Sequence, residues 1–245
     1  MTVAIVTGGG SGIGEATAHA LAQRGAHVVV ADVNEDGARA TAGAIGAAAA
    51  AVRVDVADDA SVAAMVAFAI ERFGGLDWAC NVAGIAPAPK PFVDHTHDDW
   101  QRTIDVNLSG VFWCMQHELR AMIAQGRGGA IVNMASAAGL VPAPGQPQYT
   151  AAKHGVLGLT KQAAQEFAGS GIRVNAVLPG QTETAPMRAY LDAQPDGGEK
   201  MLRRLPMGRM ATTNEIANAV AWLCSAEASY VNGVSLTVDG GLLAR

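Results

Sequence analysis

Residues 2–14 read TVAIVTGGGSGIG, a short apolar run that passes directly into a glycine-rich segment. The apolar run is typical of a buried strand, and residues 12–24 are typical of a helix. No register of the segment matches G-x-G-x-x-G, whereas G-x-x-x-G-x-G matches with Gly8, Gly12 and Gly14. Glycines between a strand and a helix let a phosphate approach the amides at the helix N-terminus. A loop that only turns the chain is the alternative, but this position after an N-terminal strand favours dinucleotide binding.

Strand-like and helix-like segments alternate along the rest of the chain. The expected strands are residues 2–6, 27–32, 51–55, 76–80, 130–136, 172–178 and 234–239. The expected helices are residues 12–24, 34–45, 59–73, 97–125, 147–169 and 213–225. Several strands are continuous apolar runs, as in sheets that are covered on both faces. The pattern predicts an α/β fold with a doubly wound, Rossmann-type parallel sheet of seven strands and helices on both faces. No linker or repeat interrupts it, so we expect one domain over residues 1–245.

Composition limits the partners that the protein can have. Charged residues make up 16% of the sequence and apolar residues 50%, so we expect an oligomer that buries further surface. The net charge of −5 and the lack of a basic run argue against nucleic acid or membrane as a partner. The first strand has no signal-like segment before it, and a cytoplasmic protein is expected. The three cysteines lie far apart, without metal-binding spacing, and are expected to be reduced.

Asp32 ends the second expected strand and bears on the choice of dinucleotide. A carboxylate there can accept hydrogen bonds from the hydroxyls of an adenosine ribose, and its charge repels a 2′-phosphate. Neither Ser11 nor Val33 supplies a cation that would attract such a phosphate. A helix-capping aspartate is the alternative interpretation. Together these residues favour NAD over NADP as the cofactor.

The carboxyl ends of the strands form the edge where such sheets bind their ligands. The expected topology places six residues along that edge: Gly8, Asp32, Asp55, Asn81, Ser136 and Pro179. The stretch YTAAK at 149–153 then sets a tyrosine and a lysine one helical turn apart. Such a pair shares a helix face, and a neighbouring ammonium lowers the pKa of a phenol. A chance pair on an amphipathic helix has the same spacing, so these five residues alone leave both interpretations open.

The order of these motifs resembles the classical short-chain dehydrogenase/reductase family over essentially the whole chain. The matching stretches are TGGGSGIG at 7–14, DV at 55–56, NVAG at 81–84, DVN at 105–107, MAS at 134–136, YTAAK at 149–153, LPGQTET at 178–184 and VDGG at 238–241. Two positions depart from the family pattern. Val82 replaces the second asparagine of the usual Asn-Asn-Ala-Gly, and Thr182 stands where the family often has Ile or Val.

The resemblance implies a catalytic set of Tyr149, Lys153, Ser136 and Asn107. Tyr149 would exchange a proton with the substrate oxygen, and Lys153 would lower its pKa and hold the nicotinamide ribose. Ser136 would hydrogen-bond the same oxygen, and Asn107, in a distorted helical turn, would position a water beside Lys153. The implied reaction interconverts a secondary alcohol and a ketone with NAD, without a metal, in a homotetramer. The residues implied to bind NAD are Gly8, Ser11, Gly12, Ile13, Gly14, Asp32, Val33, Asp55, Val56, Asn81, Ala83, Gly84, Tyr149, Lys153, Pro179, Gly180, Thr182 and Thr184.

Residues 185–210, between the Pro-Gly motif and a helix, are interpreted as a lid over the substrate. Together with residues 84–92 and 137–148 the lid would form an apolar wall, which favours a small or medium, largely neutral alcohol or ketone. Four methionines lie in the lid: Met187, Met201, Met207 and Met210.

Three other functions are weighed against this one. A 3-ketoacyl reductase of the same family is the nearest alternative. Such enzymes usually show NADP signatures and a basic docking surface, and neither is evident here, but Lys200, Arg203 and Arg204 in the lid keep this alternative open. A catalytically silent dinucleotide sensor typically lacks one of the four catalytic residues, and all four are present. A Rossmann-type transferase does not explain YTAAK.

The stretch DHTHDDW at 94–100 resembles a metal site at first sight. His95 and His97 have no third ligand at helical spacing, so no metal site is expected. Thr96 and Asp99 are instead expected to cap the helix that follows.

Overall fold

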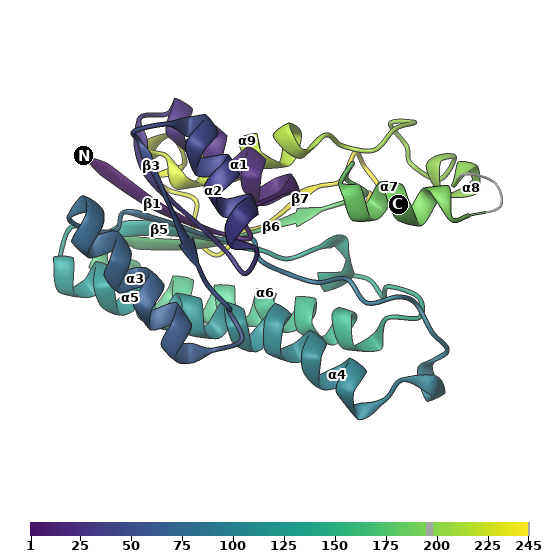
Figure 1. Ribbon diagram of the computed structural model, residues 1–245. Coiled ribbons are helices and arrows are strands. Elements are labelled where there is room, and N and C mark those ends of the chain that lie inside the picture. The colour runs from purple at the N-terminus through teal and green to yellow at the C-terminus, as the bar shows by residue number, and fades with distance from the viewer. Residues whose placement is uncertain (195–197, 245) are drawn as a thin grey trace.

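One parallel sheet organises the computed structural model, which describes residues 1–194 and 198–244 (Figure 1). Within these residues the sheet has seven strands: β1 (Thr2–Thr7), β2 (Ala26–Asp32), β3 (Ala49–Arg53), β4 (Trp78–Asn81), β5 (Gly129–Met134), β6 (Ile172–Pro179) and β7 (Ser235–Val238). Their order is β3-β2-β1-β4-β5-β6-β7. The chain runs from β1 outward to β3 and returns to the other side of β1 at β4, so the loops after β1 and β4 diverge. Doubly wound sheets bind ligands at such a switch point.

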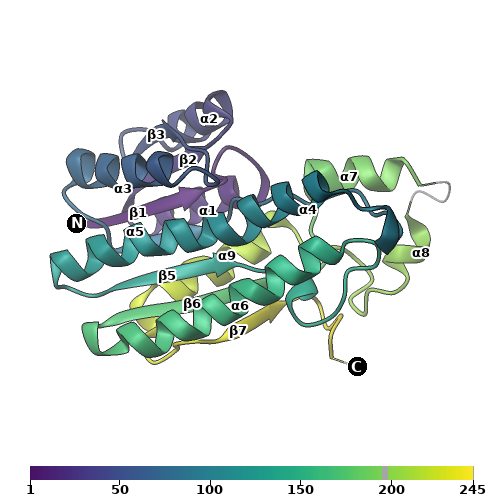
Figure 2. The same cartoon turned by 90° about the horizontal axis from the view of Figure 1, so that it is seen from below.

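Helices cover both faces of the sheet (Figures 1 and 2). One face carries α1 (Gly12–Gln23), α2 (Glu35–Ile45) and α9 (Thr213–Cys224), and the other carries α3 (Asp59–Phe73), α5 (Gly110–Gln125) and α6 (Pro147–Phe167). The shorter helices α4 (His97–Ile104), α7 (Ala185–Asp192) and α8 (Glu199–Leu202) lie towards the carboxyl end of the sheet (Figure 2). In the described ranges no helix is long and apolar enough to cross a membrane.

The strands form because their side chains are apolar on both faces of the sheet. Residues Val3–Val6 of β1 are at most 1% exposed, with Ile5 facing α3, α5 and α6 and Val6 facing α1 and α9. Burial of each such side chain contributes roughly 1.5–3 kcal/mol, so no polar alternation is needed to hold the strand. The two apolar clusters fix the sheet and leave its carboxyl edge to carry polar groups.

The structure confirms the predicted seven-stranded parallel sheet with helices on both faces, and differs at particular elements. The helix expected over 97–125 is divided into α4 and α5 by a π-helical turn, Asp105–Ser109. The strand expected over 76–80 lies at Trp78–Asn81. The lid contains α7 and α8, which no apolar periodicity indicated. Residues 195–197, within the predicted lid, lie outside the described residues.

Candidate active site

The glycine-rich loop between β1 and α1 is shaped by close contacts that exclude side chains. A Cβ atom on Gly14 would lie 1.9 Å from the carbonyl oxygen of Gly8, and one on Gly8 would lie 2.9 Å from the backbone of Ala83. The loop is therefore packed against α1 and against the segment after β4. Ser11 is the N-cap of α1 but makes no side-chain capping bond. The first amides of α1 thus have no side-chain acceptor at the cap, which fits binding of a phosphate group.

Asp32, at the end of β2, fixes this loop from the side. Its Oδ2 accepts the amide of Gly10 at 2.9 Å, and its Oδ1 accepts the amide of Asn34 at 2.9 Å. The cap of α2 is Asn34, which accepts from Gly37, so the helix-cap interpretation of Asp32 is wrong. Val33 beside it is 58% exposed and presents an apolar surface at the same edge.

The segments after β3 and β4 contribute further residues that the resemblance implies to bind NAD. Asp55 accepts the amide of Ala57 at 3.0 Å, and Val56 packs beneath Gly110, whose added Cβ would lie 3.0 Å from it. Thr7 Oγ1 accepts the amides of Val82 and Ala83 at 3.1 and 3.2 Å. These two bonds tie the end of β1 to the residues that follow β4.

The side chain of Asn81 faces the core, so only its backbone lies at the edge where the resemblance places a cofactor residue. It is 2% exposed, and its Nδ2 donates to Glu118 Oε2 and to Asn133 Oδ1, each at 3.0 Å. Asn133 in turn donates to Thr160 Oγ1 at 3.0 Å. Strand alternation explains this direction, because Asn81 and Asn133 are paired in register and their side chains reach the α5 side of the sheet. Sequence reasoning also missed Glu118, whose place in α5 gave no signal of a partner.

The segment after β6 approaches the glycine-rich loop from the opposite side. Gly180 follows Pro179, and Thr182 is 6% exposed in an isolated bridge to Ala211. Thr184 caps α7 by accepting the amide of Met187 at 3.4 Å. A Cβ on Gly12 would lie 3.6 Å from Thr184 Cγ2, so these two predicted cofactor residues are brought together.

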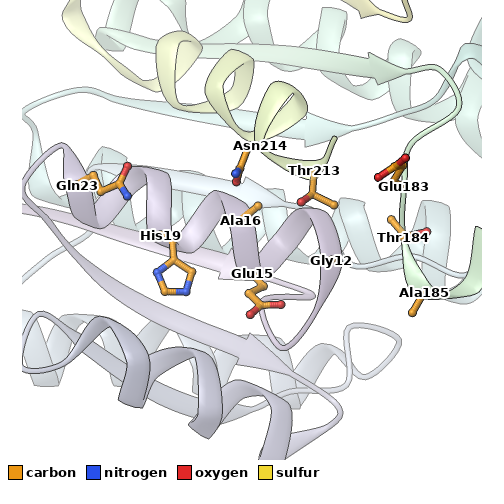
Figure 3. A pocket seen from close by; sticks show the side chains of 10 residues that line it. All are labelled: Gly12, Glu15, Ala16, His19, Gln23, Glu183, Thr184, Ala185, Thr213 and Asn214. Carbon is orange, nitrogen blue, oxygen red and sulfur yellow. The ribbon is translucent and has the colours of Figure 1, made fainter. Parts of the chain in front are cut away.

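A cavity of about 510 Å³ opens beside Gly12 and Thr184, between α1 and the N-terminus of α9 (Figure 3). Of the residues that line this cavity, only Gly12 and Thr184 were predicted from the sequence to bind the cofactor. The others are Glu15, Ala16, His19, Gln23, Glu183, Ala185, Thr213 and Asn214. Glu15, His19 and Gln23 lie at helical spacing along α1, but this pattern did not distinguish a cavity wall from an exposed helix face.

Tyr149, Lys153 and Ser136 lie together at the start of α6 and the end of β5. Tyr149 shares a hydrogen bond with Ser136, and Ser136 Oγ also accepts the amide of Ala138 at 3.1 Å. Lys153 is 3% exposed, and its Nζ lies 5.5 Å from the centre of the Tyr149 ring. The same Nζ donates to the carbonyl oxygen of Met134 at 2.8 Å. The expected helical spacing therefore puts both groups on one buried face.

The pKa of Tyr149 is shifted in the direction opposite to the one expected from the sequence. Burial raises the pKa of the phenol, and the hydrogen bond with Ser136 opposes that rise. Burial lowers the pKa of Lys153 to about 8. The ammonium is directed at the Met134 carbonyl, so desolvation outweighs its attraction for a phenolate.

Asn107 lies in the π-helical turn between α4 and α5, the distorted turn that the resemblance implied. Its Nδ2 donates to the carbonyls of Ile85 and Thr103 at 2.9 and 3.1 Å, and its Oδ1 accepts the amide of Ile85 at 3.1 Å. A Cβ on Gly84 would lie 2.8 Å from Asn107 Oδ1 and 3.7 Å from Lys153 Nζ. The two side chains thus meet on either side of Gly84.

The lid has an apolar cluster of its own. Leu191, Leu205 and Met210 are buried in it, and Met187, Met201, Leu202 and Leu242 pack against them. Met207 is instead 62% exposed. Several lid cations are paired with carboxylates: Arg188 with Glu183, Arg203 with Glu199 and Arg209 with Glu215.

The predicted helix cap at Thr96 is confirmed, because Thr96 and Asp99 form a reciprocal capping box at the start of α4. Over the described ranges, no three His, Cys, Asp or Glu side chains are grouped as a metal site. His95 has other partners, which are treated below.

A glycine-rich loop at the carboxyl edge of a doubly wound sheet defines a Rossmann-type dinucleotide-binding protein. The family model for enoyl-(acyl carrier protein) reductase matches residues 8–243. The chain is 48% identical over 245 residues to cis-4-hydroxycyclohexanecarboxylate dehydrogenase of Sinomonas cyclohexanicum, across 99% of this chain and 96% of that protein. It is 44% identical over 241 residues to 2,5-dichloro-2,5-cyclohexadiene-1,4-diol dehydrogenase of Sphingobium indicum, across 98% and 96%. The chain belongs to the short-chain dehydrogenase/reductase family, and it is an oxidoreductase.

A solved structure bears on the cofactor. A candidate 2-deoxy-D-gluconate 3-dehydrogenase from Agrobacterium tumefaciens, with bound NADP, superposes with a TM-score of 0.90 and 39% identity, over 100% of this chain and 97% of that one. The family binds a nicotinamide dinucleotide, and this neighbour holds the phosphorylated form. Membership of the family therefore does not by itself decide between NAD and NADP.

The buried carboxyl of Glu118 makes stability depend on pH. It is fully buried, burial raises its pKa from 4.5 to about 7, and the hydrogen bond from Asn81 only partly opposes this. Its Oε1 and the Oδ1 of Asn81 have no hydrogen-bond partner among the described residues. The folded state therefore holds the proton more tightly than the unfolded state. That stabilisation is complete below about 4.5 and is lost as the pH rises through about 7, a change on the order of 3 kcal/mol.

We expect Glu118→Gln to remove this dependence, because the amide stays neutral at every pH. The melting temperature of the variant should exceed that of wild type at about pH 9 and by less, or not at all, at about pH 5. Glu71→Gln makes the same change on the exposed face of α3 and serves as the control. A difference between Glu118→Gln and wild type that is the same at both pH values would show that Glu118 does not titrate in this range.

Proposed function

We propose that the protein is an NAD-dependent oxidoreductase that interconverts a small or medium, largely neutral secondary alcohol and its ketone. The observation that carries this proposal is the grouping of half-buried Tyr149 and Ser136 with buried Lys153 at the same sheet edge as the glycine-rich loop. A phenol and a hydroxyl that already share a hydrogen bond are suited to hold one substrate oxygen between them.

Each residue has a separate task in this proposal. Ser136 orients the substrate oxygen by a hydrogen bond and stabilises alkoxide charge on it. Tyr149 takes the hydroxyl proton in oxidation and returns it in reduction. Lys153, held by the Met134 carbonyl, keeps a positive charge beside the phenol. A nicotinamide cofactor held by the glycine-rich loop would supply the hydride chemistry at the substrate carbon.

The direction of the Tyr149 shift has a consequence for pH dependence. Because burial raises its pKa, the phenol stays protonated at neutral pH and is ready to donate to a ketone. Oxidation requires the phenolate, so its rate should increase as the pH rises. Reduction requires the phenol, so its rate should decrease over the same interval.

Alicyclic secondary alcohols are the substrates that we propose to test first. The two curated relatives are named for substrates with a six-membered carbon ring. The exposed apolar side chains of Leu140, Val141 and Met207, in the segments predicted to form the substrate wall, support this choice. The ketoacyl alternative is less well supported, because several of the lid cations are already paired with carboxylates.

We expect Tyr149→Phe to lower kcat at least about a hundredfold while the affinity for NADH changes less than about twofold, because only the exchangeable proton is removed. Lys153→Ala should lower both kcat and the affinity for NADH, since it removes a charge and a buried anchor of α6. Oxidation of cyclohexanol and reduction of cyclohexanone, followed by NADH absorbance across pH, measure these effects. Tyr230→Phe, at a fully exposed tyrosine, is the control. A Tyr149→Phe variant with a tenth or more of wild-type activity would exclude Tyr149 as the acid/base.

Cofactor choice is expected to follow the charge of Asp32. A 2′-phosphate beside this carboxylate costs several kcal/mol, so kcat/KM should favour NAD over NADP by about a hundredfold or more. Asp32→Asn should narrow that ratio by removing the charge while an oxygen stays available to the loop amides. When Val33→Arg is added to Asp32→Asn, kcat/KM should become higher with NADP than with NAD. Equal use of both cofactors by wild type would show that Asp32 serves only to hold the loop.

We also propose that the protein is a homotetramer with 222 symmetry. The low charge content supports it, as do the exposed side chains of Phe112 and Ile123 on α5, at 39% and 45% exposure. We expect light scattering to give a mass four times that of the chain at micromolar concentration. A stable monomer under those conditions contradicts the proposal.

A further inference from the structure

His95 joins two segments that are far apart in the sequence and adjacent at the site. Its Nε2 lies 3.0 Å from the carbonyl oxygen of Gly145, and its Nδ1 lies 3.2 Å from Gln148 Nε2. A carbonyl only accepts, so Nε2 donates, and an amide nitrogen only donates, so Nδ1 accepts. Both ring nitrogens of His95 are therefore used in contacts with the residues that precede Tyr149.

The first turn of α6 depends on such long-range bonds. Its N-cap residue, Gln146, makes no capping bond, and its side chain donates instead to the carbonyl of Pro87. The carbonyl of Gly145 also accepts the amide of Lys90 at 2.9 Å. The segment 85–95 is thus attached at several points to the residues immediately before Tyr149.

The buried side chain of Gln148 depends on His95 for its hydrogen bond. The side chain of Gln148 is 1% exposed, and its Oε1 has no hydrogen-bond partner in the described part of the chain. Its bond to His95 is the interaction that the structure shows for its buried amide. Without His95 the amide would be buried and unpaired, which is unfavourable unless the turn moves. Tyr149 is the next residue in that turn.

We propose that His95 is a positioning residue for the acid/base turn: through Gly145 and Gln148 it sets the place of Tyr149 and couples the segment 85–95 to it. This inference rests on the proposed role of Tyr149. It also gives the DHTHDDW stretch a role that does not involve a metal. The coupling means that a substrate lying against residues 85–95 also constrains the phenol that exchanges its proton.

The test compares His95→Ala with His97→Ala, a matched change two residues away at an exposed histidine in the first turn of α4. With cyclohexanol as the probe, kcat per NADH-binding site should fall about tenfold or more in His95→Ala, because small displacements of a catalytic group are costly. The dissociation constant for NADH should change less than about twofold in both variants. Without cofactor, hydrogen exchange of the amides at 148–153 should be at least about fivefold faster in His95→Ala alone.

Two further measurements separate positioning from general loss of stability. Water that reaches a loosened Tyr149 relieves the burial that raises its pKa, with Ser136 and Lys153 still facing it. The pH profile of oxidation should then move downward by about half a unit or more. When Gln148→Ala is added to His95→Ala, kcat should fall by less than about a further twofold. The reason is that the two residues act through one contact, which His95→Ala has already removed.

The outcomes distinguish this inference from the proposed function. If His95→Ala keeps the kcat and pH profile of His97→Ala while Tyr149→Phe is inactive, His95 has no positioning role and the proposed function stands. An active Tyr149→Phe variant would overturn the proposed function and the role of His95 with it. If His95→Ala does not fold, His95→Asn takes its place in the test, because the side-chain oxygen of Asn can replace the Nδ1 acceptor. The kcat of His95→Asn should also fall, but by less than that expected for His95→Ala.

Discussion

The hydrogen bond from the Lys153 ammonium to the Met134 carbonyl fixes the arrangement of the whole site. A buried cation needs an acceptor, and the Met134 carbonyl at the end of β5 supplies one. This bond joins α6 to the end of β5, and one turn earlier in α6 Tyr149 lies beside Ser136, which follows the same strand. The proposed catalytic group thus lies where one helix is attached to one strand end.

The sequence predicted the sheet, its order of elements and most of the edge, because these depend on local patterns. Apolar runs, the glycine spacing and the one-turn separation of Tyr149 and Lys153 are all visible without tertiary structure. The direction of the Asn81 side chain was not predicted, since a strand-end residue can point to the edge or to either face. The Tyr149 shift was also misjudged, because it depends on how deeply the phenol is buried and where the ammonium points. Contacts such as those of His95 join two loops whose paths no periodicity defines.

Two sets of polar groups are buried on the face of the sheet that carries α5 and α6, with different consequences. The set around Lys153 has an acceptor for its charge, and so it can stay ionised near neutral pH. The set around Glu118 has only amide and hydroxyl partners, and so its carboxyl is neutral in the most stable form of the protein. Within the same apolar core, the Lys153 ammonium can therefore stay charged while the Glu118 carboxyl stays neutral.

The separate apolar cluster of the predicted lid has a consequence for how substitutions there act. Its buried residues pack on one another and on Leu242, and they belong to neither of the clusters that hold the sheet. A substitution at Leu191, Leu205 or Met210 therefore disturbs the packing of this segment and removes no side chain from the two clusters of the sheet. The segment and the sheet are in this respect separately packed parts of one chain.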